Sequence, residues 1–294
     1  LALLAKRFDK DYLKVLADVY LQLSVHRPEM VEFYYQLGLM LRHQDQKKLT
    51  RRCFNEARNQ LVKLGDGELR RLMEARLQLA LDESSTLYEI KWRKEKFVID
   101  GLLSEWERFK PLAFTTDRQL SYGDDLWLGI HDLSGKIYLA RTNSDLYIAG
   151  VITDDVLLRP DGDGGDFVGI YFDLRPTAAA FHTRQSEAGD GCFLLRVCSP
   201  DAETPKASLE LNVSTAYQIS SMRTEHGYTF EMKLPLSLFG AYLPEKKKRF
   251  GLGVQLVDFD TGGDIERVKA MGFLLPATRG DDKLQPQLFG FGRF

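Results

Sequence analysis

Five aspartates in one Gly-rich stretch are the residues whose type and spacing point most directly to chemistry. They are Asp154, Asp155, Asp161, Asp163 and Asp166, within the segment DDVLLRPDGDGGD. Carboxylate oxygens on a flexible turn are the ligands that Ca²⁺ prefers. The segment lacks the spacing and the terminal Glu of an EF-hand loop, so a solvated turn is the alternative interpretation. We therefore predict a possible calcium site here, with no other cofactor indicated.

Aromatic and planar polar side chains form two further clusters on predicted loops. One cluster is Tyr122 with Trp127, and the other is Phe181 with His182 and Arg184. Aromatic faces stack on the apolar faces of sugars, and Arg donates hydrogen bonds to hydroxyl groups. These clusters predict ligand contacts, although Trp127 in the segment DDLWLGI fits a core position equally well.

Catalysis and haem binding receive little support from the residues. Asp258 and Asp260 form a carboxylate pair of the kind used in glycoside hydrolysis, but they fall in one strand-end turn. No GxSxG, HExxH or phosphate-binding loop is present. The histidines and methionines supply no convincing pair of axial haem ligands. The sequence predicts a non-catalytic binding or assembly protein.

The bulk properties fit a protein with two folded units and exclude some partners. The chain has 294 residues and a net charge of −2, which gives no general attraction to nucleic acid. No apolar stretch is long enough to span a membrane. The first residue is Leu1, which suggests an excised piece or a mature form. The three cysteines, Cys53, Cys192 and Cys198, are expected to be free thiols.

Residues 1–90 have the apolar spacing of helices joined by short connections. Expected helices include 31–42, 46–64 and 68–81. One helix pair resembles a tetratricopeptide repeat, with Tyr34, Leu37 and Gly38 in the first helix and Phe54 and Ala57 in the second. In this interpretation Gly38 and Ala57 allow close approach of the helices while Phe54 fills the gap. Ordinary helical hairpins are the alternative.

From Phe97 onward the apolar period changes to two, with polar turns and no amphipathic helices between the segments. This pattern predicts an antiparallel β-sandwich. The fold class is therefore multidomain, α plus all-β, with units at 1–90 and 91–294. The expected strands are 97–99, 135–141, 145–153, 167–174, 191–199, 206–213, 216–224, 228–234, 250–259 and 289–294.

The second unit resembles the family 9 carbohydrate-binding module and the wider DOMON-like group of β-sandwiches. The resemblance follows the family's order through the segments IDGLLSEW (99–106), SDLYIAGVITDD (144–155), GDFVGIYFD (165–173), GYTFEMKLPLSL (227–238), FGLGVQLVDFD (250–260) and LFG (288–290). Trp106 is expected to plug one end of the sandwich.

The resemblance implies a glycan-binding cleft in which two tryptophans sandwich a sugar, and it implies structural calcium. At the two tryptophan positions this sequence has Asp163 or a neighbouring Gly, and Phe273 as the nearest aromatic residue. Gly169 replaces a family acidic residue, and Arg196 matches a family polar contact.

The resulting prediction is a glycan or cell-envelope polymer bound by the sandwich, with a protein partner docked by the helical repeats. The alternative is the sensor or scaffold part of a membrane-associated signalling or envelope assembly, in which the sandwich makes protein contacts. In both cases we expect a periplasmic or extracellular location, with any tether outside this sequence.

Overall fold

The structure is a computed structural model in which the chain separates into two compact units. Described residues up to Leu87 belong to the first unit, and those from Tyr88 onward belong to the second. The structure describes residues 30–43, 46–63, 70, 73–74, 77, 81, 87–94, 96–123, 125–158, 165–174, 191–200, 207–211, 215–243, 249–260, 268–273 and 290–294. The predicted division into 1–90 and 91–294 stays a prediction.

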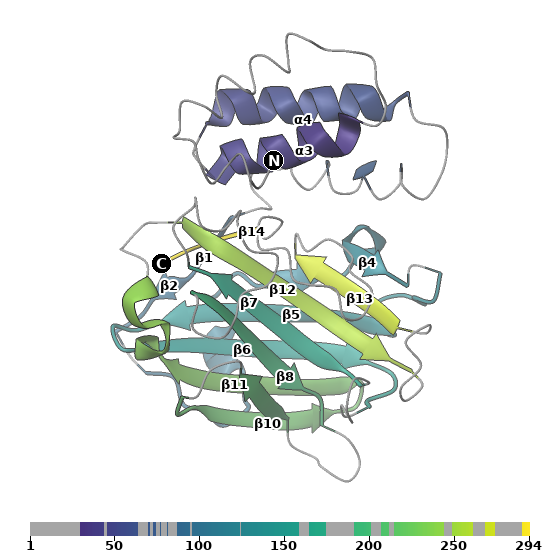
Figure 1. Ribbon diagram of the computed structural model, residues 1–294. Coiled ribbons are helices and arrows are strands. Elements are labelled where there is room, and N and C mark those ends of the chain that lie inside the picture. Colours follow the sequence, from purple (N-terminus) through teal and green to yellow (C-terminus); the bar gives the residue numbers. More distant parts are fainter. Residues whose placement is uncertain are drawn as a thin grey trace. The chain divides into compact units, whose positions relative to one another are not determined.

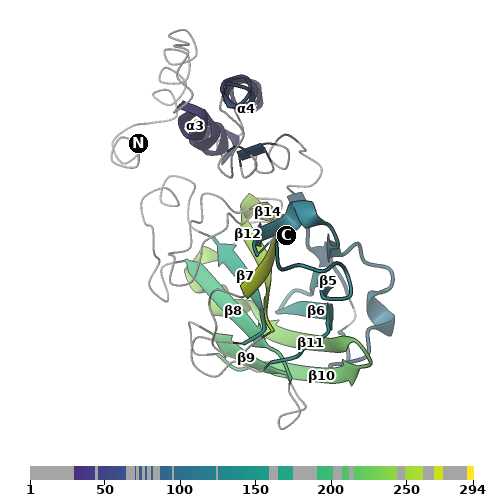
Figure 2. The same ribbon diagram turned by 90° about the vertical axis from the view of Figure 1, so that its right-hand side faces the viewer.

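The first unit contains helices α3 (Val31–His43) and α4 (Lys47–Leu61), which pack side by side (Figures 1 and 2). A Cβ atom added to Gly38 would lie 2.5 Å from Cε1 of Phe54, so the ring occupies the space that a larger residue at position 38 would need. The predicted contact between Gly38 and Phe54 is confirmed. The tetratricopeptide resemblance itself stays a prediction, and part of the expected helix at 68–81 lies outside the described residues.

The second unit is a sandwich of two β-sheets (Figures 1 and 2). The eight-stranded sheet runs in the order β1 (Leu87–Glu89), β14 (Gly290–Arg293), β12 (Arg249–Phe259), β7 (Phe167–Asp173), β8 (Cys192–Cys198) and β9 (Ser208–Leu211), with β13 (Val268–Phe273) pairing with β12 and β4 (Leu120–Tyr122). The six-stranded sheet runs in the order β10 (Gln218–Thr224), β11 (Gly227–Pro235), β6 (Asp145–Asp154), β5 (Leu133–Arg141) and β2 (Lys91–Trp92), with β3 (Leu112–Phe114) pairing with β5.

Alternating residues of both sheets form the core. Ile148 of β6, Ile170 of β7 and Val254 of β12 are fully buried in one cluster that draws on both sheets. Successive side chains of a strand point to opposite faces, so the intervening residues lie on the outer faces. The predicted sandwich is confirmed. Its long strands β5 to β8 and β10 to β12 pair in antiparallel fashion, whereas the short strand β2 pairs parallel with β5.

The expected strand at 97–99 is wrong, because this segment does not pair with a sheet. Instead Phe97 stacks on Trp106 with ring centroids 4.2 Å apart. Phe97 also contacts Tyr147, and Trp106 also contacts Tyr138. Those tyrosines lie on the faces of β5 and β6 opposite the core. Trp106 therefore covers the outer face of the six-stranded sheet rather than plugging one end. Aromatic burial positions this segment without ladder hydrogen bonds.

Several short strands, β1 to β4, and the longer β13 were not predicted. Tyr122 was expected on a loop, but it ends β4, where it pairs with Ala270 of β13. The three cysteines are free and buried, as predicted. No helix among the described residues is long and apolar enough to cross a membrane.

Candidate functional site

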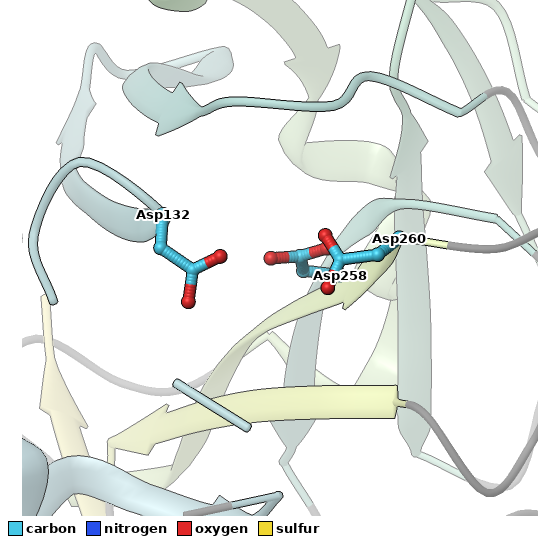
Figure 3. Close-up of side chains that lie close together, drawn as sticks. All are labelled: Asp132, Asp258 and Asp260. Carbon is cyan, nitrogen blue, oxygen red and sulfur yellow. The ribbon is translucent and has the colours of Figure 1, made fainter. Parts of the chain in front are cut away.

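A buried lysine lies among three carboxylates at one end of the sandwich. Lys269 of β13 is the register partner of Asp258 of β12, and Asp260 follows that strand. Its Nζ lies 3.0 Å from Oδ2 of Asp258 and 2.9 Å from Oδ2 of Asp260. It also donates a short hydrogen bond to Oδ1 of Asp132, which precedes β5. Figure 3 shows the three carboxylates converging from these separate segments.

The side chain of Lys269 is fully buried, which makes its charge costly without compensation. Burial on its own lowers the pKa of Lys269, but the hydrogen bonds and charges of Asp132, Asp260 and Asp258 raise it above its ordinary value. The ammonium group therefore stays charged and acts as an internal cation for this first triad, Asp132, Asp258 and Asp260.

A second triad shares Asp258 and adds Asp154 from the end of β6 and Asp166 from the residue before β7. One carboxylate oxygen from each lies within 4.8 Å of the others, and all three residues are buried. Asp166 accepts backbone N–H groups of Leu158 and Phe259, the latter at 2.9 Å. Asp166 therefore links the loop before β7 to the end of β12.

The other two members of the second triad have oxygens with fewer partners. Oδ1 of Asp154 accepts the N–H of Val156 at 2.9 Å. Both oxygens of Asp258 are buried and accept no hydrogen bond of good geometry, although Oδ2 is near the Lys269 ammonium. The second triad thus contains buried carboxylate oxygens with little donor compensation.

Burial and nearby carboxylates raise the carboxyl pKa values of this triad. Desolvation is the main cause in each case, and the like charges include Asp258 for Asp154 and Asp166 but Asp260 and Asp132 for Asp258. The pKa is raised to about 10 for Asp154, to about 8 for Asp166 and to about 7 for Asp258. The charge of Lys269 lowers the pKa of Asp258 and so opposes this increase. Either protons or a cation must balance the second triad at neutral pH.

Hard oxygen donors converging from three segments fit Ca²⁺ in ligand type. Of the five predicted aspartates, the structure brings together Asp154 and Asp166; Asp155 is exposed, and Asp161 and Asp163 lie outside the described residues. Sequence reasoning missed Asp258 as a partner of these two. A signal was present, because Asp258 continues the inward series Leu252, Val254, Leu256 of β12.

A buried carboxylate of a different kind lies on the outer face of the six-stranded sheet. Glu231 of β11 accepts the indole N–H of Trp106 at 2.7 Å and the backbone N–H groups of Gly101 at 2.9 Å and Asp100 at 3.2 Å. Burial raises its pKa while these hydrogen bonds oppose the shift. This network fastens the segment 99–106 to the sheet.

The outer face of the eight-stranded sheet carries aromatic and planar polar groups on three adjacent strands. Gly169 of β7 is the register partner of Arg196 of β8 and of Gln255 of β12. The guanidinium of Arg196 lies 3.9 Å from the ring centroid of Phe167. The hydroxyl of Tyr171 donates a hydrogen bond to Oε1 of Gln255 at 3.4 Å.

Tyr171 also occupies the space beside Gly169. A Cβ at position 169 would lie 2.5 Å from the Tyr171 hydroxyl oxygen, so a larger side chain there would displace the ring. The outer face therefore carries a partly exposed amide and guanidinium beside the buried ring of Tyr171. Amide and guanidinium groups are suited to hydrogen-bonding sugar hydroxyls.

The structure describes only part of the remaining predicted ligand residues. Trp127 is half-buried against the main core, and its indole N–H donates to the carbonyl of Leu133 at 2.9 Å. Phe273 ends β13. Phe181, His182 and Arg184 lie outside the described residues. The ligand-binding roles of all of these residues, and of Tyr122, stay predictions.

A family model described as carbohydrate family 9 binding domain-like matches residues 99–290. The chain belongs to this family. The match begins at the IDG segment and ends at the LFG segment, which are the outermost segments of the resemblance in the sequence. The tetratricopeptide-like and DOMON-like assignments are not part of this match and stay predictions.

Solved structures agree on the fold of this family 9 domain. A carbohydrate binding module family 9 from Caldicellulosiruptor kristjanssonii, in complex with glucose, is 16% identical with a TM-score of 0.51, covering 70% of this chain and 94% of its own. The same module in complex with cellotriose gives the same identity, TM-score and share of this chain, with 92% of its own length covered. No curated protein matches the chain.

Hydrogen bonds to buried carboxylates connect several of the family segments in the folded chain. The IDG turn and Trp106 meet Glu231 of the GYTFEMKLPLSL segment, while Asp166 of the GDF segment meets Phe259 of the VDFD segment. These contacts join segments that are far apart in the sequence. Two buried carboxylates, Glu231 and Asp166, therefore join four of the six family segments in pairs.

Proposed function

We propose that the family 9 domain is a non-catalytic carbohydrate-binding module. The observation that carries the proposal is the family match over residues 99–290. The similar modules from Caldicellulosiruptor kristjanssonii are described in complex with glucose and cellotriose, which makes β-linked glucose oligomers the first ligands to test.

The outer face of β7, β8 and β12 is the proposed contact surface. Arg196 and Gln255 are partly exposed and supply a guanidinium and an amide. Tyr171 is buried and holds the Gln255 amide through its hydroxyl, and the ring of Phe167 packs against the Arg196 guanidinium. A sugar needs several donors and acceptors at fixed positions together with an apolar surface. These four side chains come from adjacent strands of one sheet, which holds them more rigidly than loops would.

The test is calorimetric titration of the full chain with glucose, cellotriose and a broad glycan panel. Arg196→Ala is expected to weaken binding at least tenfold, because truncation removes both the guanidinium donors and its packing on Phe167. Arg223→Ala, on the exposed face of edge strand β10, is the matched control and should leave binding unchanged. Absence of binding across the panel would refute carbohydrate recognition.

We further propose that Asp154, Asp166 and Asp258 hold a calcium ion that stabilises this end of the sandwich. The specific observation is Asp258, whose two buried carboxylate oxygens accept no hydrogen bond of good geometry and whose neighbouring ammonium group, Lys269, is shared with Asp132 and Asp260. The ion would supply the positive charge that Lys269 gives to the first triad. Ca²⁺ should raise the melting temperature of EDTA-treated protein, and Asp154→Asn should reduce that increase while Asp117→Asn, an exposed control, should not.

Protein docking by the helical unit and an extracytoplasmic location also remain proposals. The α3–α4 pair, together with the buried helical residues Met73 and Leu77 of the same cluster, supplies the described packing on which docking rests. If the glycan panel shows no binding, the sensor or scaffold role becomes the better assignment. Affinity capture with the full chain, compared with a chain carrying Gly38→Leu to disrupt the helix pair, tests whether a protein partner depends on these helices.

A further inference from the structure

Trp92 is an exposed aromatic residue whose ring is held in one orientation. Its exposed fraction is 50%, whereas Trp106 is fully buried. The indole N–H donates to Oδ1 of Asn143 at 2.8 Å. A fixed Trp on a surface loses little conformational entropy when a ligand stacks on it. The ring is therefore preorganised as a stacking surface, and it precedes residue 99, where the family match begins.

Arg141 is the register partner of Trp92 across the parallel pair of β2 and β5. Its guanidinium lies 5.4 Å from the ring centroid of Phe294, and its Nε is buried without an acceptor. Among the described residues Arg141 makes no side-chain hydrogen bond or ion pair. A guanidinium in this position offers donors to an incoming carboxylate, which it binds in a bidentate manner.

The guanidinium of Arg141 favours an anion over a cation beside Trp92. Lys91 and Arg93 are neighbours of Trp92 in the sequence, but successive side chains of a strand point to opposite faces. Arg93 lies over the rings of Phe97 and Phe109, and Lys91 is paired with Glu89. β2 and the end of β5 lie beside the C-terminal residue in Figure 1, consistent with the Arg141–Phe294 contact.

We propose that Trp92, Arg141 and Asn143 form a second ligand site that binds a carboxylated sugar, such as a uronic acid unit of a polysaccharide. The pyranose ring stacks on the indole, the carboxylate meets the guanidinium, and the free amide NH₂ of Asn143 donates to a hydroxyl. The choice of a sugar rests on the proposed function, but the residues are distinct from those of the outer-face site around Arg196.

The test compares three trisaccharides on the full chain: trigalacturonate, its methyl ester and cellotriose. The ester retains the rings but removes the charge. The wild-type chain should bind trigalacturonate at least tenfold more tightly than the ester. Trp92→Ala should weaken binding of both at least tenfold, and Arg141→Gln should remove the preference for the acid. Arg196→Ala should leave trigalacturonate binding unchanged.

Controls separate a binding defect from a folding defect. Tyr217→Ala removes an exposed aromatic residue elsewhere and should have no effect. Asn143→Ala leaves the ring in place but frees its orientation, so binding should weaken severalfold while the melting temperature is retained. Trigalacturonate should also reduce acrylamide quenching of tryptophan fluorescence, because Trp92 is the exposed member of the three tryptophans.

The outcomes distinguish this proposal from the proposed function. Unchanged trigalacturonate binding in Trp92→Ala, or equal binding of acid and ester, would overturn the second site. Loss of cellotriose binding in Arg196→Ala with trigalacturonate binding intact supports two separate sites. Failure of cellotriose to bind, with trigalacturonate bound through Trp92, would refute the outer-face site and leave the second site standing.

Discussion

Glu231 and Asp258 are both completely buried, yet the chain compensates their carboxylates in different ways. Glu231 accepts three N–H groups that come from Trp106 and the turn at Asp100 and Gly101. These donors are neutral, fixed by the fold and present whatever the solution contains. Glu231 is therefore a structural group that needs nothing from outside the protein.

Asp258 is compensated mainly by charge rather than by hydrogen bonds. Its oxygens accept no hydrogen bond of good geometry, and its positive neighbour Lys269 is shared with Asp132 and Asp260. The second triad adds two more carboxylates on the other side. A buried acid balanced in this way responds to protons and cations in solution. The difference separates a carboxylate balanced by fixed neutral donors from one whose charge balance depends on protons or cations.

Removing the ammonium group of Lys269 should cause the largest loss in the free energy of unfolding. Lys269→Met leaves three buried or half-buried carboxylates without the ammonium group. Breaking a buried ion pair by removing one partner typically costs about 3–5 kcal/mol. Urea denaturation at pH 7 measures the loss in the free energy of unfolding.

Lys233→Met is the matched control, since Lys233 is partly exposed and lies 3.7 Å from Asp145. Pairs of this kind contribute less than about 1 kcal/mol. If the two variants lose similar stability, Lys269 is not the cation on which the first triad depends.

The pH dependence of the free energy of unfolding should reveal the raised carboxyl pKa values of the second triad. The folded-state pKa values of Asp154, Asp166 and Asp258 lie above the ordinary aspartate value. The folded protein therefore retains protons that the unfolded chain has lost, from about pH 4 up to the raised values. In EDTA the free energy of unfolding should fall as pH rises from 6 to 9, by about 1.4 kcal/mol per unit for each retained proton.

Calcium should flatten this dependence, because an ion that binds the deprotonated triad stabilises the folded state more as pH rises. Urea denaturation at pH 6, 7, 8 and 9, with EDTA or with CaCl₂, measures both slopes. Equal stability across this range in EDTA would show that the carboxyl pKa values are not raised in the folded protein.

Much of the second unit was predictable because its long strands alternate and its turns are polar. The strands β5 to β8 and β10 to β12 were each predicted within a few residues of their bounds. The short strands β1 and β2 contain too few residues to show a period. Phe97–Ile99 does alternate, but contacts with Trp106 and Glu231 override strand pairing there.

The candidate sites were predictable only in part, because they depend on register between distant strands. Asp154 and Asp166 belong to one stretch of sequence, so their grouping was visible. The meeting of Asp258 with Lys269 requires the pairing of β12 with β13, and Asp132 comes from before β5. No local pattern contains those pairings. Arg141 and Trp92 are likewise joined only by the register of β2 on β5.

Neutral isosteres of the two buried acids should give the smallest effects and the sharpest contrast. Glu231→Gln replaces one accepting oxygen with an NH₂ group that faces an N–H donor, which should cost about 1.5–3 kcal/mol because hydrogen bonds to a charged acceptor are lost. Asp258→Asn at pH 8 in EDTA removes one of the three carboxylates around Lys269, which keeps Asp132 and Asp260 as partners, and it relieves repulsion on Asp154 and Asp166. Because the lost attraction and the relieved repulsion oppose each other, its free energy of unfolding should fall less than that of Glu231→Gln. Calcium should stabilise the Glu231→Gln chain as it stabilises the wild type, and it should stabilise Asp258→Asn less. The reverse ranking in EDTA would mean that Asp258, rather than Glu231, is the acid that holds the fold together.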